Sequence, residues 1–236
     1  MIPRLPERSR PAPGSACAAD ATDASPPRAA SPGRPKDLSK GQAILDSARR
    51  LFLEHGFEGV SMDQIAAAAG VSKLTVYNHY GDKETLFGEA VRSYCEQGFP
   101  DAVFQDDPAQ PLQAALLAIA RRYFDFVCAP DAIAGHRLLC SPQMADTPVS
   151  RLFWTSGPQH IQERMAALLL HRAGHGQLQV DDPCRAASQF FALVRGDPHS
   201  RLLFGCDVCT SEEIAAHLQA SVAMFLRAYA PSGPTR

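Results

Sequence analysis

Two short patterns have the spacing of metal or redox sites. Cys206 and Cys209 form a C-x-x-C pair, and His171 and His175 lie four residues apart, which would place both rings on one helix face. No second C-x-x-C pair accompanies the first, and the glycines on either side of His175 predict that the helix ends there. We therefore interpret the thiols as loop cysteines and expect no metal site and no cofactor.

The sequence lacks the patterns that mark common catalytic sites. It contains no nucleophile elbow, no phosphate-binding loop, no dinucleotide fingerprint and no H-E-x-x-H motif. An enzyme with an unmarked site is therefore a rival interpretation without a motif to support it. A second rival is a ligand-binding or adaptor protein that has lost contact with nucleic acid.

The segment 61–87 has the spacing of a helix-turn-helix unit. Ala66 supplies a small residue where two helices would approach closely. Gly70, four residues on, permits the positive φ of the turn, and Val76 is placed to pack against the first helix. Ala, Gly and Val at these offsets predict a DNA-binding head.

The second helix of this unit, residues 72–80, would lie in the major groove of DNA. Thr75 offers a hydroxyl and a methyl group, which suit a base edge or a thymine methyl. Lys73 and Tyr77 suit phosphates, and so does Lys83, which lies beside the free N–H groups of the next helix. The predicted DNA-binding residues are Arg34, Ser61, Ser72, Lys73, Leu74, Thr75, Tyr77, Asn78, His79, Tyr80 and Lys83.

The run AAGVSKLTVYNHYGDKETLF resembles the signature of the TetR family of bacterial regulators. Leu74 departs from that pattern, because a glycine is common there, and this bears on how closely the helix approaches DNA. The resemblance implies a three-helix head, a fourth helix that joins it to a ligand-binding and dimerising body, and a repressor. The matching positions are Ala69 to Ser72, Thr75, Tyr77, Tyr80, Lys83-Glu84 and Leu86.

The C-terminal part is similar to one branch of that family, the AefR-like regulators. This similarity says little about the ligand. The resembling pieces are His136-Arg137-Leu138, Gly176-Gln177-Leu178 before Asp181-Asp182, the helix with Phe190-Phe191, and Met224-Phe225-Leu226-Arg227-Ala228-Tyr229.

Helical periodicity predicts the elements that position these residues. Ser61, Ser72 and Asp82 are placed to cap the second, third and fourth helices, and no segment alternates with the period of a strand. The fold is therefore expected to be all-α. The expected parts are a disordered, basic and Pro-rich tail (1–36), a helix-turn-helix domain (37–85) and a helical regulatory and dimerisation domain (86–230).

Composition fits this organisation. Of the 236 residues 45% are hydrophobic and 20% are charged, and no apolar run approaches the roughly 18–20 residues that span a bilayer. The N-terminus lacks the apolar core of a secretory signal, so we expect a cytoplasmic protein without a membrane partner. Gly33-Arg34-Pro35-Lys36 is either an arm for the minor groove or a charged linker end.

The expected partners are double-stranded DNA with a palindrome-like operator, a second copy of the chain, and a small, largely apolar effector. Residues 82–97 are expected to be the only link between effector pocket and head. Aromatic and polar side chains of the body predict the pocket as Phe124, His136, Arg137, Phe153, Trp154, His160, Phe191 and Arg195. The predicted homodimer interface uses the last two helices, 182–196 and 211–229, through Ala187, Phe190, Leu218, Val222, Phe225 and Leu226.

Overall fold

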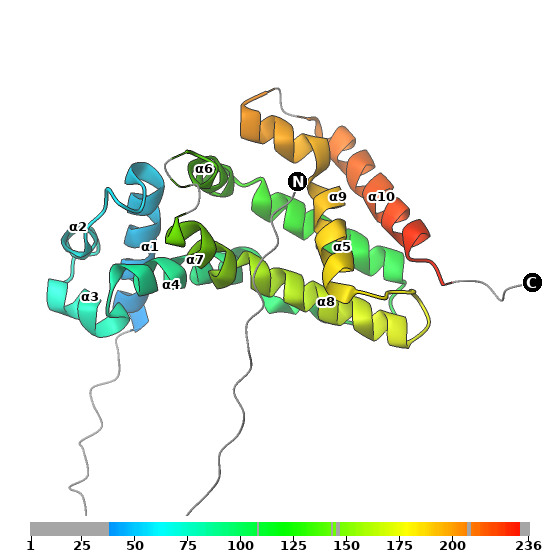
Figure 1. Ribbon diagram of the computed structural model, residues 1–236, viewed down its shortest axis with the longest axis horizontal. Coiled ribbons are helices and arrows are strands. Elements are labelled where there is room, and N and C mark those ends of the chain that lie inside the picture. The colour runs from blue at the N-terminus through cyan, green and yellow to red at the C-terminus, as the bar shows by residue number, and fades with distance from the viewer. Residues whose placement is uncertain (1–37, 108, 143, 145–146, 207–208, 232–236) are drawn as a thin grey trace, which may run out of the picture. The chain divides into compact units, whose positions relative to one another are not determined.

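The computed structural model describes residues 38–107, 109–142, 144, 147–206 and 209–231. Within these ranges the chain is helical and forms no β-strand, which confirms the all-α prediction. Helices α1 to α3 lie together at one end of Figure 1, α5 and α8 to α10 lie at the other, and α4, α6 and α7 lie between them. The elements are α1 Leu38–His55, α2 Met62–Ala68, α3 Lys73–Tyr80, α4 Lys83–Gly98, the 3-10 helix η1 Asp101–Phe104, α5 Leu112–Val127, α6 Pro130–Leu139, α7 Pro148–Ser156, α8 Pro158–Gly174, α9 Pro183–Phe204 and α10 Ser211–Ala228.

The predicted N-terminal caps of α2, α3 and α4 are present. Ser61 and Gln64 form a reciprocal capping box: the backbone N–H of Gln64 donates to Ser61 Oγ (3.3 Å), and the backbone N–H of Ser61 donates to Gln64 Oε1 (2.8 Å). The Ser72 hydroxyl and the Asp82 carboxylate each accept from the N–H group three residues on. These bonds satisfy amides that have no partner in the first helical turn.

The turn between α2 and α3 has the geometry that its sequence predicts. Gly70 has a φ of 65°, a conformation that a side chain would strain. Ala66 is 4% exposed and accepts a hydrogen bond from the backbone N–H of Val71 at 3.0 Å. Val76 is fully buried, so the opposite face of α3 lies at the surface of the head.

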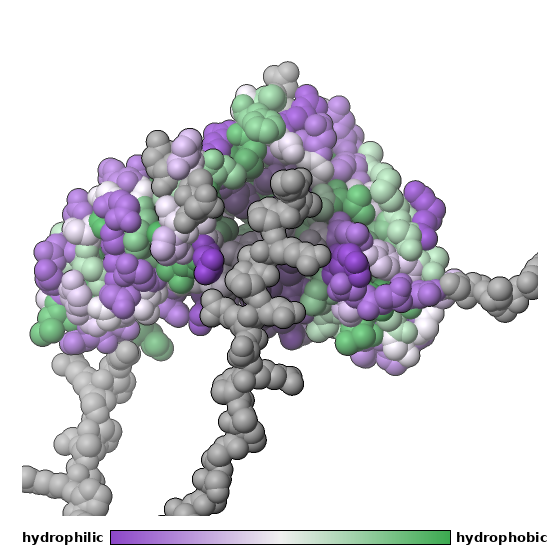
Figure 2. All heavy atoms as spheres, viewed as in Figure 1, coloured by the Kyte–Doolittle hydropathy of each residue, from purple (hydrophilic) through white to green (hydrophobic). Residues whose placement is uncertain are grey.

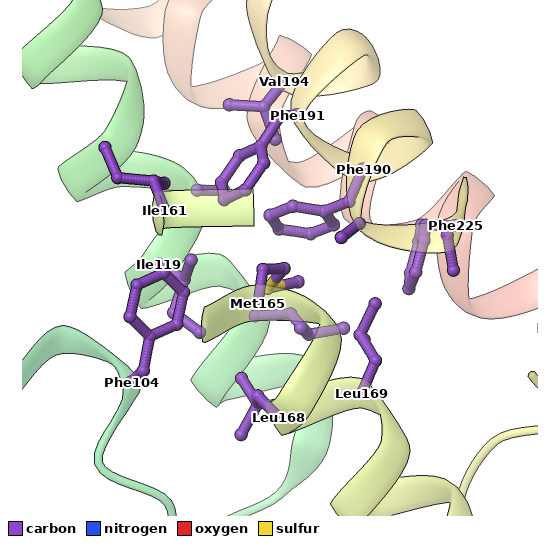
Figure 3. Close-up of a cluster of buried hydrophobic side chains, with 14 of the residues drawn as sticks. Phe104, Ile119, Ile161, Met165, Leu168, Leu169, Phe190, Phe191, Val194 and Phe225 are labelled. Atoms are coloured by element: carbon purple, nitrogen blue, oxygen red, sulfur yellow. The ribbon is translucent and has the colours of Figure 1, made fainter. Parts of the chain in front are cut away.

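The core of the body is formed by α5, α8, α9 and α10. Figure 3 shows Phe190 and Phe191 of α9 next to Met165 and Ile161 of α8, and all four side chains are at most 5% exposed. Phe225 of α10 packs edge to face on Phe190, with their ring centroids 5.2 Å apart. None of the described helices is long and apolar enough to cross a membrane.

Three helices of the body begin with a proline. Pro130, Pro148 and Pro158 occupy the first position of α6, α7 and α8. Proline is well tolerated there because the missing N–H would have no helical partner and its fixed φ suits the helix. The prolines therefore separate short helices rather than exclude them.

Arg172 on α8 holds the segment between η1 and α5. Its side chain is 0% exposed, and its Nε donates to Asp106 Oδ1 at 2.7 Å. The remaining guanidinium donors reach the carbonyls of Asp107 (2.9 Å) and Gln110 (3.3 Å) and the side chain of Gln177 (2.9 Å). A fully buried charge is tolerated because each of its nitrogens has an acceptor.

Helix α9 has a sharp break near its middle. Gly196 has a φ of 45° and a ψ of −152°, and Pro198 follows within the same helix. Proline cannot donate to the carbonyl of Val194, and His217 Nε2 of α10 lies 3.0 Å from that oxygen. The Ser221 hydroxyl donates to the carbonyl of Leu193 at 3.1 Å. Helix α10 thus supplies hydrogen bonds that the break removes from α9.

Candidate DNA-reading helix and effector cavity

Helix α3 exposes the side chains expected of a DNA-reading helix. Leu74 is 69% exposed and Tyr77 is 42% exposed, and Asn78 is exposed as well. Figure 2 shows mostly hydrophilic residues over the visible part of α1 to α3, with a few apolar residues among them. Apolar groups such as Leu74 find a suitable contact in the thymine methyl of the major groove.

Lys73 forms a salt bridge with Asp63 of α2, with Nζ 2.9 Å from Oδ1. The hydrogen bond to Asp63 raises the pKa of Lys73, so the side chain is charged at neutral pH. Both side chains are more than half exposed, and exposed pairs of this kind contribute little to stability. The ammonium of Lys73 is therefore available to exchange Asp63 for a phosphate.

Lys83 lies differently from the expected phosphate contact. Its Nζ donates to the backbone carbonyl of Phe57 at 3.0 Å and lies 4.2 Å from the centroid of the same residue's ring. A carboxylate oxygen of Glu58 is 3.8 Å away, and the Lys83 side chain is 22% exposed. The contacts of Lys83 in the described structure are thus internal, and they tie the start of α4 to the loop after α1.

Other predicted DNA contacts also have internal partners. The Tyr80 hydroxyl donates to the carbonyl of Gly41 on α1 at 2.9 Å, and burial raises the pKa of Tyr80. Thr75 Oγ1 is 2.9 Å from the hydroxyl of Ser72, and Thr75 is half-buried. His79 is half-buried as well, and Arg34 lies outside the described residues. Ser61 and Ser72 act as caps, so these residues position the reading helix.

A cavity of about 400 Å³ lies where the head meets the body. Helices α1, α4, α5, α6, α7, α8 and α9 all contribute to its lining, which is mainly apolar. A volume of this size suits a small organic ligand. Five of the predicted pocket residues line it: His136, Phe153, Trp154, Phe191 and Arg195.

Three predicted pocket residues lie elsewhere, which corrects that part of the prediction. Phe124 is 3% exposed within the core of the body. Arg137 donates to the carbonyls of Leu202 (2.6 Å) and Leu203 (2.8 Å) near the C-terminus of α9. His160 is paired with Asp101 on the surface. Their residue types suit a pocket, but their helix faces do not point to it.

The sequence interpretation missed the part of the cavity wall that belongs to the head. Phe52 and Phe57 line the cavity and also stack on each other in the head core, with ring centroids 5.7 Å apart. Phe87 of α4 packs edge to face on both rings. Periodicity assigns these residues to a core, and it carries no signal that the core borders a cavity. Further aromatic lining comes from Tyr94, Tyr123 and Phe126.

Helix α6 forms a second connection between cavity and head, so α4 is not the only link. Asp131 Oδ2 of α6 is 4.0 Å from Arg49 Nη2 of α1, and the Arg49 guanidinium lies over the ring of Tyr94. Leu138 packs against the head core. A Cβ at Gly135 would lie 3.6 Å from Leu53 of α1, an ordinary van der Waals distance, so this part of α6 lies directly against α1.

Two histidines meet at the α9 side of the cavity. His199 Nε2 lies 3.4 Å from His136 Nδ1, and both residues line the cavity. Burial lowers the pKa of both rings; the pKa of His199 falls to about 4, helped by His136 and Arg195. Both rings are therefore neutral at neutral pH.

Two family models match the chain. Residues 44–90 match bacterial regulatory proteins of the tetR family, and residues 114–231 match the C-terminal domain of AefR-like transcriptional repressors. The chain belongs to the TetR family. It is a DNA-binding transcriptional regulator rather than an enzyme, and the resemblance seen in the sequence is confirmed.

Individual relatives agree with this membership in the TetR family. The chain is 27% identical to the transcriptional repressor AcnR of Corynebacterium efficiens over 79% of its own length and 94% of that protein. It is 34% identical to the flavonoid-responsive regulator FrrA, with a TM-score of 0.66, covering 82% of this chain and 98% of FrrA. A TetR-family regulator structure from Mesorhizobium loti gives 29% identity and a TM-score of 0.69, with 82% and 98% coverage.

The predicted dimer interface of this TetR-family chain needs correction. Five of its six residues lie within the core of the single chain, where none is more than 3% exposed: Ala187, Phe190, Leu218, Val222 and Phe225. Leu226 is half-buried against that core. Side chains buried in this way have almost no surface to offer a partner.

The outer face of the same two helices is apolar and grooved. Met224 of α10 is 51% exposed, and Ala192 and Ala220 are exposed beside it. Residues one position away from the buried stripe therefore form an exposed apolar surface on these two helices. The groove is lined by Gln189, Ala192, Leu193, Gly196, His217, Ala220, Ser221, Met224, Phe225, Ala228 and Tyr229.

Among the described residues, no group of three or more His, Cys, Asp or Glu side chains is placed to hold a metal ion. The ring of His171 is next to that of His175, with 3.2 Å between their Nε2 atoms, and its Nδ1 is 2.8 Å from Asp106. Cys206 is exposed, and Cys209 Sγ accepts a hydrogen bond from Arg201 at 3.7 Å.

Proposed function

We propose that the protein is a homodimeric repressor that acts in the cytoplasm and leaves its operator when a small, largely apolar effector fills the cavity. A single reading helix contacts few base pairs, and two heads related by a twofold axis double the readout over a palindrome-like operator. Successive major grooves on one face of DNA lie about 34–36 Å apart, so the distance between the two heads decides affinity.

The observation that carries this proposal is the shared lining of the cavity. Phe52 and Phe57 belong to the head core, whereas Phe191 belongs to the body core, and all three border the same space. A ligand in that space contacts both parts at once. The ligand shifts the equilibrium between the DNA-binding and the released arrangement of the heads. The size of the shift is the difference between its binding free energies for the two arrangements, for which about 1–3 kcal/mol is typical.

The proposed dimer surface is the outer face of α9 and α10. Met224, Ala192 and Ala220 provide an exposed apolar surface with small residues, which allows helices of two protomers to approach closely. Exposed apolar patches on a soluble protein mark sites of association.

For DNA, we propose direct contacts from the exposed residues of α3 and from the half-buried Thr75, and positioning roles for the others. Leu74, Tyr77 and Asn78 would meet base edges or the backbone, Thr75 would meet a base edge, and Lys73 would meet a phosphate. The remaining predicted contacts act through the geometry of the head, namely Ser61, Ser72, His79, Tyr80 and Lys83.

The first experiment is a titration of the full chain against labelled duplexes that tile the DNA upstream of its own gene. We expect one duplex to be bound in preference to unrelated competitor DNA, with two protomers per site. Binding that is equal for every duplex would contradict sequence-specific regulation and favour the adaptor interpretation.

The second experiment tests the effector cavity. FrrA is described as flavonoid-responsive, so the flavonoid naringenin is a suitable first probe. Ala132→Phe places a ring in the cavity wall, whereas Ala134→Phe on the same helix adds the ring at an exposed position outside the lining. We expect release of DNA by naringenin from the wild type and from Ala134→Phe, and no release from Ala132→Phe.

Linkage provides a further check on this mechanism. If the effector weakens DNA binding by a given factor, the operator must weaken effector binding by the same factor. Calorimetry of naringenin with and without operator DNA measures the affinity for the effector in each of the two conditions. Equal affinities in the two titrations would rule out this form of control, and the body would then serve dimerisation alone.

A further inference from the structure

The α9 side of the cavity gathers groups that donate hydrogen bonds. Arg195, His136, His199 and Tyr123 line it together and come from α9, α6 and α5. Arg195 acts electrostatically on all three neighbours, since it contributes to the lowered pKa of both histidines and opposes the rise in the pKa of Tyr123. The four groups therefore lie close to one another.

The Arg195 guanidinium has no anionic partner in the described part of the chain. No Asp or Glu oxygen there lies within 4.0 Å of its nitrogens, in contrast to Arg49 and Arg172, which are both paired. The carboxylate that lines the same cavity, Asp131, is the partner of Arg49. Arg195 is exposed, so water reaches its charge where it borders the cavity, and no carboxylate of the described residues pairs with it.

The break in α9 fixes where this charge lies. Arg195 directly precedes Gly196, and the two carbonyls before it are held by His217 and Ser221 of α10. His199 lies four residues after Arg195, on the other side of the break. The backbone directly before Arg195 is therefore held by hydrogen bonds from a second helix, which favours a preorganised position for that side chain.

The histidine pair adds a neutral donor. Because both rings are neutral, one proton is shared between His199 Nε2 and His136 Nδ1. Whichever nitrogen holds that proton, one of the two remaining ring nitrogens of the pair carries an N–H group. No hydrogen bond from either outer nitrogen to another described residue is present, so this donor is free for a ligand.

We infer that the effector carries an ionised oxygen, a carboxylate or an acidic phenol, which Arg195 binds with help from the His136–His199 pair. The aromatic body of the ligand packs against Phe191, Phe153 and the other rings of the lining. Guanidinium groups match a carboxylate with two parallel hydrogen bonds, and such charge-assisted bonds are the strong ones. This inference rests on the proposed function and names the chemical class of the effector.

Matched pairs of probes test the charge directly. The first pair is 4-phenylbenzoate and its primary amide, and the second is 7-hydroxyflavone, whose hydroxyl is acidic, and 7-methoxyflavone. Calorimetry with the full chain gives the affinities. Trp154 is the single tryptophan of the sequence and lines the cavity, so quenching of its fluorescence reports occupancy.

We expect the wild type to bind the acid of at least one pair about ten-fold more tightly than its neutral partner, since one charge-assisted hydrogen bond accounts for roughly that factor. Arg195→Gln removes the charge and should bring this ratio close to one. Arg122→Gln, an equal loss of charge at an exposed site on α5 outside the cavity, should leave the ratio unchanged. The pair that shows the preference distinguishes carboxylate from phenolate.

Three results would overturn the inference: a ratio near one in the wild type for both pairs, a ratio that Arg195→Gln does not change, or no binding of any of the four probes. DNA binding is measured in the same samples and is judged separately. If a neutral probe binds and releases the operator while the ratio is one, the acidic effector is wrong and the ligand-responsive repressor stands. If the wild type binds no duplex specifically, the proposed function fails whatever the ratio.

Discussion

Replacing Lys83 by Met separates a structural role from a phosphate contact. The substitution keeps most of the aliphatic stem and removes the ammonium, which donates to the carbonyl of Phe57 at 3.0 Å and lies 4.2 Å from the centroid of its ring. If these contacts hold the head together, the loss appears in the stability of the protein. If the ammonium contacts DNA, the loss appears in the salt dependence of binding.

The magnitude follows from the contacts. A hydrogen bond from a charged donor contributes about 1.5–3 kcal/mol, and a cation over an aromatic ring adds about 0.5–1 kcal/mol at an exposed site. Water can reach part of the side chain, which is 22% exposed, and Glu58 at 3.8 Å is 87% exposed and contributes little. We expect Lys83→Met to lower the free energy of unfolding by about 2 kcal/mol.

Lys73→Met is the matched control, because its ammonium has a salt bridge to an exposed carboxylate. We expect it to change stability by less than about 1 kcal/mol and to lower the slope of log affinity against log salt by about 0.9, the value of one phosphate. Urea denaturation and operator titrations at several salt concentrations measure both quantities. Lys83→Met with full stability and a slope reduced by about 0.9 would refute our assignment and restore Lys83 as a phosphate contact.

Four further changes have defined outcomes. Arg172→Met should lower the free energy of unfolding, measured by urea denaturation, by about 3 kcal/mol, because it leaves the Asp106 carboxylate without its main partner. The Asp106 side chain is only 12% exposed. A loss below about 1 kcal/mol would contradict the buried network. Thr75→Ala should relax preference at one operator position by about 1 kcal/mol, and a uniform loss over all sequences would contradict base contact. Met224→Glu should yield monomers in light scattering, and an unchanged dimer would place the interface elsewhere. In the folded protein the pKa of His199 is lowered from 6.5 to about 4, so its ring is neutral at neutral pH. Its contribution to stability is therefore complete above pH 6.5 and is lost as the pH falls towards 4. His199→Phe should flatten the dependence of the unfolding free energy on pH over that range, and an unaltered profile would be evidence against this.

The head was largely predictable because its geometry depends on local rules. A capping box requires Ser61 and Gln64 three residues apart, and the turn requires a residue such as Gly70 that tolerates a positive φ. Both constraints can be read from neighbouring residues. The partners of Lys83 were not predictable in this way, because the carbonyl of Phe57 lies 26 residues away in sequence.

In the body, periodicity predicted which residues are buried and gave no indication of what covers them. Phe190 and Phe225 were predicted to lie in the dimer interface, but they pack on each other within one chain. Met224 lies one residue from Phe225, about 100° around the helix, and so faces outward. Similarly, Phe124 and Phe191 are both buried, and only the packing of α5 against α9 determines that Phe191 borders the cavity.

The same packing explains how binding of an effector in the cavity acts on the DNA-reading helix through few intervening contacts. Phe57 lines the cavity, and both its ring and its carbonyl hold the ammonium of Lys83 at the start of α4. On the other side, Asp131 of α6 holds Arg49 of α1. A ligand that displaces the Phe57 ring therefore acts on α4 and on the loop after α1 together. A ligand that fits equally well in the DNA-binding and in the released arrangement of the protein would bind without releasing DNA. The fit of the ligand against Phe57 therefore decides whether a bound molecule acts as an inducer.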